Sequence, residues 1–257
     1  MRGVCLLVTA AALTAVVAAQ SPDAAQVLAS AREAIGGDKK ITAIKTLVIT
    51  GRTRQVRGNN LVPIEFEIDC ELPDKYVRKD ETPAQDTDPT TVGFIGEQLI
   101  QVPAPGAGRG GRGEQGGRGG GPPRGATARQ DFARLMLGLF ASTYPSFPLT
   151  FKYVAVGEAP EGKADILDVS GPANFTARFI VQQSTHLPVM LMWQAPAPPQ
   201  GAPAEQRMYF ADFRDVDGLK LPFRVRRAVA GETVEETTFD RIRINPKIDP
   251  RKFEVPK

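Results

Sequence analysis

Apolar positions near the start of the chain recur with helical spacing. Ser21-Pro22-Asp23 offers a capping side chain, a proline for the first turn and an acidic residue near the positive end of a helix. Apolar residues then follow at intervals of three and four positions: Ala24, Val27, Leu28, Ala31 and Ile35. Gly36-Gly37 ends the run, because glycine readily adopts the backbone conformation that terminates a helix. The pattern predicts one amphipathic helix over 21–35.

From Ile41 onward the apolar period changes to two. Ile64, Phe66, Ile68 and Cys70 alternate with acidic residues, as in strands that bury only one face. Further strand-like runs occupy 151–157, 164–170, 174–182, 188–194, 206–214, 219–228 and 232–244. Turn-forming pairs separate them: Glu161-Gly162, Gly171-Pro172, Asp217-Gly218 and Ala230-Gly231. The predicted fold class is mainly β with two or more helices, built on an antiparallel sheet of about eleven strands that must curl because it is so wide.

A second helix is predicted over 127–140. Thr127 and Gln130 have the spacing of a capping box. A stripe of large apolar residues follows at helical spacing: Phe132, Leu135, Met136, Leu139 and Phe140. Each of these side chains would contribute roughly 1.5–3 kcal/mol if buried, so the segment can act as a lid over a concave sheet.

The strand predicted over 188–194 is apolar on both faces, with Leu191 and Trp193 opposite Met190 and Met192. Such a strand needs a cover or a ligand on each face. The candidate lining of an apolar cavity is a set of large residues from several strands: Phe66, Ile68, Phe179, Met192 and Phe210. The pattern does not say which face of each strand is concave, because a shift of one residue exchanges the two faces. An ordinary filled core accounts for the same positions, so both interpretations stay open.

Two inserts interrupt the predicted series of strands and helices. Residues 104–125 hold 11 of the 25 glycines together with several arginines, so the formal net charge of +3 comes from this segment. Gly106 to Gly111 match a dinucleotide-binding pattern, but neither a preceding strand nor a following helix is predicted there. No aromatic residue lies between the arginines for base stacking, so we expect a solvated loop that does not bind nucleic acid. The second insert, 195–204, is a Pro/Ala loop inside a hairpin connection.

The first residues have the features of a secretory signal. Arg2 precedes an apolar run from Val4 to Val17, and small residues precede Gln20 at the expected cleavage site. The run has about 14 apolar residues, fewer than the roughly 20 that cross a bilayer. We therefore expect 1–19 to be a cleaved signal peptide and 20–257 to be a single exported domain.

The residue types needed for catalysis are scarce. The chain has one histidine and two cysteines, of which Cys5 lies in the leader, so a His/Cys metal cluster and an intramolecular disulfide are excluded in the mature chain. His186 has no catalytic partner pattern, and Glu235 and Glu236 should point to opposite faces of a strand. We expect no catalytic residues, no metal and no cofactor, and a buried, inert thiol at Cys70.

The order of several segments resembles a known superfamily. The chain opens with ASAREAIGGDKKITAIKTLVITGR, continues through HLPVMLMW and closes with DGLKLPFRVRR and FDRIRINPKIDPRKFEVP. It resembles the LolA/LolB-like superfamily, and specifically the outer-membrane lipoprotein-sorting-like periplasmic proteins of Gram-negative bacteria. The resemblance implies an incomplete, half-open antiparallel β-barrel that is lidded by helices around a hydrophobic cavity for acyl chains.

The leading hypothesis for function is a soluble, monomeric periplasmic carrier that binds a lipid or a lipid-modified protein without chemistry. Other proteins of the envelope are further possible partners. The alternative is a non-enzymatic structural or interaction module of the envelope, with a filled core and the Gly/Arg loop as its contact element. An envelope enzyme is the third hypothesis.

Overall fold

The segments with alternating apolar residues form one antiparallel sheet. A computed structural model describes residues 23–83, 85, 87–103, 124–159, 161–195 and 203–254. Its strands are β1 (Thr46–Arg57), β2 (Asn60–Glu71), β3 (Lys75–Glu81), β4 (Thr90–Ile95), β5 (Gln98–Val102), β6 (Thr150–Ala159), β7 (Gly162–Gly171), β8 (Phe175–Gln182), β9 (Pro188–Gln194), β10 (Glu205–Val216), β11 (Leu219–Val229) and β12 (Glu232–Ile244). The spatial order is β5-β4-β3-β2-β1-β12-β11-β10-β9-β8-β7-β6. The sheet therefore has 12 strands and remains unclosed, with β5 and β6 at its edges.

Short turns set the register of neighbouring strands. Asp217 and Gly218 both have positive φ, 54° and 76°, and connect β10 to β11 in a two-residue turn. Ala230 and Gly231 also have positive φ and form a two-residue turn between β11 and β12. The two halves of the sheet meet where β1 pairs with β12, with Leu47 opposite Ile244. The predicted hairpin turns are confirmed at both places, because such turns match the twist of the flanking strands.

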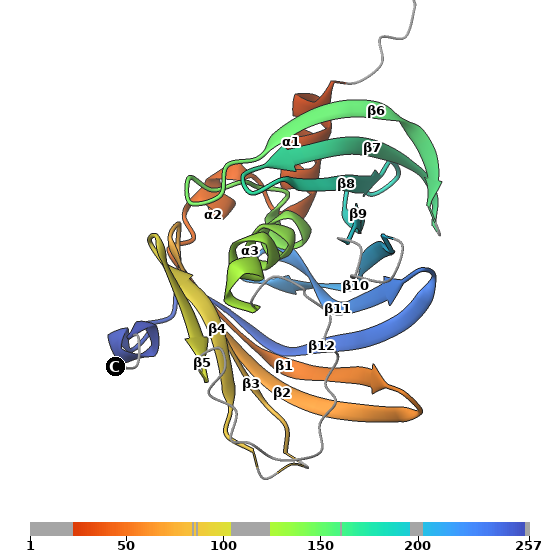
Figure 1. The fold of residues 1–257 in the computed structure, drawn as a ribbon. Coiled ribbons are helices and arrows are strands. Elements are labelled where there is room, and N and C mark those ends of the chain that lie inside the picture. The colour runs from red at the N-terminus through yellow and green to blue at the C-terminus, as the bar shows by residue number, and fades with distance from the viewer. Residues whose placement is uncertain are drawn as a thin grey trace, which may run out of the picture.

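The sheet curls around one helix. The helices are α1 (Ala24–Ile35), α2 (Asp38–Thr42), α3 (Arg124–Phe140) and the short 3-10 helix η1 (Pro250–Phe253). Figure 1 shows α3 inside the concavity, with the arm β1–β5 on one side and the arm β6–β9 on the other. Helix α1 lies at one end and contacts β6, β11 and α3, whereas η1 lies against β3 on the outside. We call the face toward α3 the concave face and the opposite face the convex face.

Both predicted helices exist, with different starts. Asp23, and not Ser21, is the N-cap residue of α1, and its carboxylate accepts a hydrogen bond from the Gln26 amide at 2.7 Å. Helix α3 begins at Arg124, so Thr127 lies inside the helix and the predicted capping box is wrong. The amphipathic stripes were predicted correctly because apolar spacing is set by helix geometry, whereas caps depend on single residues.

The predicted fold class is confirmed, as an open antiparallel sheet with a helix in its concavity. The strand count differs from about eleven because the short strands β3, β4 and β5 carry weak alternation. The signal 1–19, the insert 104–125 up to position 123 and most of the loop 195–204 lie outside the described residues. The base of that loop is described: the Ala195 amide donates to the Ala204 carbonyl at 3.0 Å, which closes the β9–β10 hairpin. In the described part of the chain, no helix is long and apolar enough to cross a membrane.

Candidate functional site

The concave face carries one large apolar cluster. Of the predicted lining residues, Phe66, Ile68, Phe179 and Phe210 all belong to it and are buried. Cys70 belongs to it as well, and burial raises the pKa of its thiol, as expected for an inert cysteine. The structure thus brings together residues from β2, β8 and β10 that are far apart in the sequence.

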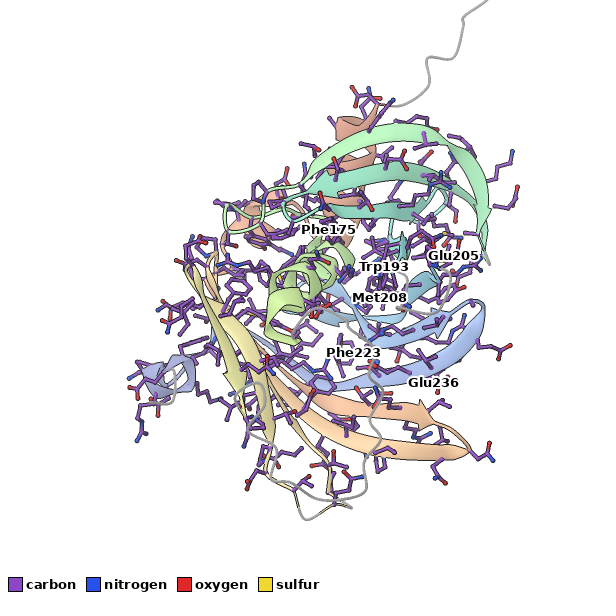
Figure 2. All side chains as sticks on the ribbon, in the orientation of Figure 1. Phe175, Trp193, Glu205, Met208, Phe223 and Glu236 are labelled. Carbon is purple, nitrogen blue, oxygen red and sulfur yellow. The ribbon has the colours of Figure 1, made fainter. Side chains whose placement is uncertain are left out.

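Met192 does not lie with these residues. It packs on the convex face in a smaller cluster with Met190 and Ile180. Leu191 and Trp193 instead point toward α3 and join the main cluster, and Figure 2 shows Trp193 on that side of the sheet. The placement of Met192 on the concave face is therefore corrected: strand alternation put it opposite Leu191, and only the position of α3 shows which face is inside.

Helix α3 supplies the apolar stripe that was proposed as a lid. Phe132, Met136, Leu139 and Phe140 are buried in the main cluster, and Leu135 is half-buried against it. Ala133 and Leu137, which lie outside the predicted stripe, are also buried. Most of the C-terminal half of the helix is thus enclosed, as for a helix that lies within a core and not on its surface.

The arm β1–β5 and the middle strand β10 hold α3 in different ways. Toward β3 and β4, the Phe132 ring contacts the rings of Tyr76 and Phe94 at centroid distances of 5.7 and 5.4 Å. Toward β10, Gly138 lies so close to Phe210 that an added Cβ would fall 2.1 Å from a carbon of that ring. Polar contacts add to both sides, since Arg129 donates to the Gly96 carbonyl and Gln130 to the Ala173 carbonyl. The helix therefore bridges two arms that are otherwise unconnected at their edges.

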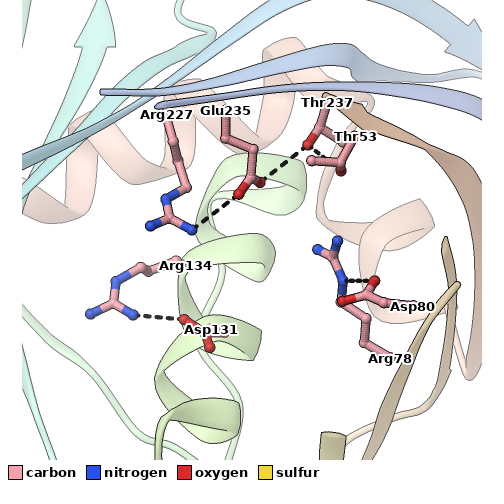
Figure 3. A network of polar contacts seen from close by, with 8 residues as sticks. All are labelled: Thr53, Arg78, Asp80, Asp131, Arg134, Arg227, Glu235 and Thr237. Carbon is pink, nitrogen blue, oxygen red and sulfur yellow. Dashed lines mark hydrogen bonds and ion pairs between the residues drawn. The ribbon is translucent and has the colours of Figure 1, made fainter. Parts of the chain in front are cut away.

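Beside the apolar cluster, the concave face becomes polar (Figure 3). Arg227 contacts Glu235 at 3.4 Å, and the Thr237 hydroxyl donates to Glu235 at 3.4 Å. Arg78 pairs with Asp80 at 2.7 Å, and Arg134 of α3 pairs with Asp131 at 3.0 Å. Three arginines thus face the concavity, each with an acidic partner.

Burial and neighbouring charges change the acidity of these arginines. Burial lowers the pKa of Arg134, the charge of Asp131 raises it, and the like charge of Arg227 lowers it again; the net pKa is below the ordinary value. Burial also opposes the charge of Arg78, but Asp80, with smaller contributions from Tyr76 and Glu235, raises its pKa above the ordinary value. The positive charge of Arg134 is therefore compensated less well by its neighbours than that of Arg78.

These arginines were not among the site residues predicted from the sequence. One signal was present: Leu219, Leu221, Phe223, Val225 and Arg227 alternate along β11, so Arg227 continues the buried face. Arg134 likewise lies within the apolar run of α3. A charged residue on an otherwise buried face is informative because it needs partners there.

The convex face carries two open depressions. One, of about 600 Å³, is lined by Lys152, Asp168, Arg178 and Met192 among others. The second, of about 470 Å³, is lined mostly by charged residues, including Arg52, Glu65 and Lys79. These side chains lie on the convex face, and the linings also include residues of the main cluster: Phe151, Val169, Ala177 and Trp193 in the first depression and Phe66 in the second. Among the described residues, no group of His, Cys, Asp or Glu is arranged to hold a metal ion.

Comparison with solved structures identifies the architecture. A LolA superfamily protein from Nitrosomonas europaea matches with a TM-score of 0.59 and 13% identity, over 91% of this chain and 98% of that chain. A domain assigned to outer membrane lipoprotein sorting from Vibrio parahaemolyticus matches with a TM-score of 0.52 and 8% identity, over 88% and 94%. A DUF1329 family protein from Desulfovibrio piger matches with a TM-score of 0.50 and 7% identity, over 89% and 95%.

No family model and no curated protein matches the sequence. The structural matches have low identities and cover nearly the whole of each chain, so the likeness concerns the fold. The fold that the sequence resemblance implied is thus confirmed, and the chain has the LolA-like architecture of an open β-barrel with a helix in its concavity.

Proposed function

We propose that the protein is a non-enzymatic periplasmic carrier that holds the acyl chain of a lipid or of a lipid-modified protein between α3 and the concave face. The observation that carries the proposal is the position of α3. Its apolar stripe forms one cluster with Phe66, Ile68, Phe179 and Phe210 inside a sheet that is not closed. If α3 moves outward, it leaves a concave apolar surface that an acyl chain fits.

Two further points support this function. The LolA-like fold is shared with a domain assigned to lipoprotein sorting. The expected signal peptide over 1–19 would export the chain, and the periplasm is the compartment in which such a carrier would work. Binding would be driven by burial of methylene groups, each contributing about 0.8 kcal/mol.

The experiment is identification of the bound molecule, followed by a chain-length series. We expect organic extraction and mass spectrometry of the purified mature protein to release an acylated compound. In displacement of the neutral dye Nile red, each added methylene should tighten binding about fourfold, which corresponds to about 0.8 kcal/mol. No extractable lipid together with no dye binding would refute the carrier.

The second candidate is an envelope interaction module with a filled core. It is favoured by one observation: Met136, Leu137 and Phe140 are each 0% exposed, as in a helix that never leaves its site. A module of this kind would bind neither Nile red nor fatty acids, so the same experiment separates the two functions.

A further inference from the structure

Two buried N–H groups in the concavity have no hydrogen-bond partner. They are the Nε atoms of Arg134 and Arg227, which the described part of the chain leaves unpaired. Leaving a buried donor unsatisfied typically costs about 1–3 kcal/mol, and more when the group is charged. Arg134 is only 7% exposed, so water does not readily replace the missing acceptor.

The two guanidinium groups come from the helix inside the concavity and from the sheet that surrounds it. Arg134 belongs to α3 and Arg227 to β11, and Figure 3 shows the Arg227 guanidinium next to the Arg134 side chain, whose terminal nitrogens are turned toward Asp131. Their like charges are close enough for Arg227 to lower the pKa of Arg134. Each has one acidic neighbour, Asp131 and Glu235, and the Arg227–Glu235 contact of 3.4 Å is long for a charged pair. An oxyanion between the two cations would reduce their repulsion and offer acceptors to both free N–H groups.

The walls around the pair are apolar. The Arg134 guanidinium lies over the Trp193 ring at 4.4 Å and near the Phe175 ring at 5.2 Å. Met208, half-buried against the main cluster, is the cross-strand neighbour of Arg227. The arginine pair therefore lies at the border between the apolar cluster and the polar part of the concave face. A molecule that reaches both regions must be amphipathic.

We propose that Arg134 and Arg227 bind the oxyanion headgroup, a carboxylate or a phosphate, of an amphipathic ligand whose acyl chain lies in the main cluster. This inference rests on the proposed function and adds the chemical class of the ligand. Because Arg134 is carried by α3, outward movement of the helix opens the gap between the two guanidinium groups. The bound anion then ties α3 to β11 and holds the helix over the ligand.

The Glu235 carboxylate competes with a bound headgroup for the Arg227 guanidinium. Its side chain is 14% exposed, contacts Arg227 and accepts a hydrogen bond from Thr237. A headgroup that binds Arg227 has to act against the charge of this carboxylate. Glu235→Gln keeps the size of the side chain and removes the charge, so it should tighten binding of anionic ligands.

The test compares ligands that share a chain and differ in the headgroup. Dodecanoate, dodecyl phosphate and dodecanol are titrated below their aggregation limits against the full mature protein, with Nile red displacement as the readout. Hydrogen bonds to charged groups contribute about 1.5–3 kcal/mol, so at least one anion should bind about tenfold or more tightly than dodecanol. The tighter of the two anions identifies a carboxylate or a phosphate as the preferred headgroup.

Three variants and one control locate the effect. Arg227→Gln and Arg134→Gln should each reduce the preference for the anion to near parity while dodecanol binding is kept, and Glu235→Gln should increase the preference. Arg227 is more exposed than Arg134, with a side-chain exposure of 38%, so its variant tests the site even if Arg134→Gln destabilises the fold. Arg224→Gln removes the same charge from the exposed convex side of β11 and should leave the preference unchanged.

The outcomes separate the inference from the proposed function. If both anions and dodecanol bind equally well, or if Arg224→Gln lowers the preference as much as Arg227→Gln, the headgroup site is refuted and the carrier remains. If the protein binds neither the dye nor any of the three ligands, the carrier is refuted and the headgroup site is refuted with it.

Discussion

Helices α1 and α3 pack on the same sheet by different means. The ends of α1 are fixed by local hydrogen bonds: the side chains of Asp23 and Gln26 accept from each other's backbone amides in a capping box at its start, and the Gly36 amide closes its end on the carbonyls of Arg32 and Glu33. An ion pair between Arg32 and Asp38 ties it to α2. Helix α3 is held mainly by side chains that reach it from both arms of the sheet.

This difference indicates that α1 is a fixed element of the fold and that α3 is a movable one. The apolar face of α1 is buried in the main cluster, and its capping and turn contacts are local and persist whatever lies in the concavity, so α1 is expected to stay in place. The ring contacts of Phe132, the stacked Arg134 and the close approach at Gly138 are tertiary contacts that a ligand can replace. We therefore expect destabilising substitutions in α3 to affect ligand binding, whereas destabilising substitutions in α1 should affect folding.

The largest effect is expected from a charge placed on each helix. Met136→Glu and Ile35→Glu both introduce a carboxylate where the native side chain is 0% exposed, at a cost of several kcal/mol if it stays buried. We expect Met136→Glu to release α3 from a sheet that remains folded and to abolish fatty-acid binding, since the charge can reach water. Ile35→Glu should unfold the whole protein. Hydrogen exchange and circular dichroism measure both outcomes.

Phe140→Glu serves as an independent second variant on α3, because its side chain is equally buried. If Met136→Glu and Phe140→Glu unfold the chain as completely as Ile35→Glu does, α3 is an ordinary core helix. The comparison between the two helices would then be wrong, and the interaction module would be favoured.

A smaller effect is expected at the contact between α3 and β10. In Gly138→Ala the new methyl group would meet the Phe210 ring at 2.1 and 2.3 Å, so the helix or the ring must move. Overpacking of this kind typically costs about 1–3 kcal/mol. We expect a lower midpoint of chemical denaturation and stronger Nile red binding, because the helix is displaced from the sheet.

Phe210→Leu is the matched control, since it removes the ring that the methyl group meets. The double variant should recover part of the loss, which a double-mutant cycle measures as a coupling energy. Strictly additive effects would show that the close approach at Gly138 does not hold α3 in place.

The smallest effect is expected at the start of α1. Asp23→Ala removes the carboxylate that accepts from the Gln26 amide, and loss of an N-cap typically costs about 1 kcal/mol. The thermal midpoint should fall slightly while Nile red binding and exchange in α3 stay unchanged. Altered binding in this variant would mean that α1, like α3, takes part in the site.

Much of the candidate site could be predicted from local pattern. The stripe of α3 and four of the predicted lining residues share one cluster because helical and strand spacing decides which side chains share a face. The assignment of Met192 failed because nothing local distinguishes the two apolar faces of β9. The arginine pair was missed because Arg134 and Arg227 are 93 positions apart and meet only when α3 enters the curled sheet.

By itself, the sequence determined the type of helices α1 and α3 and of most strands, the hairpin turns at Asp217-Gly218 and Ala230-Gly231, and the width that forces the sheet to curl. These features follow from backbone geometry and apolar periodicity within about a dozen residues. Only the tertiary structure decided which face is concave, that α3 fills the concavity, and which charges face each other there. Burial and electrostatic partners depend on which distant segments cover a strand, and the period of a strand is the same on either face.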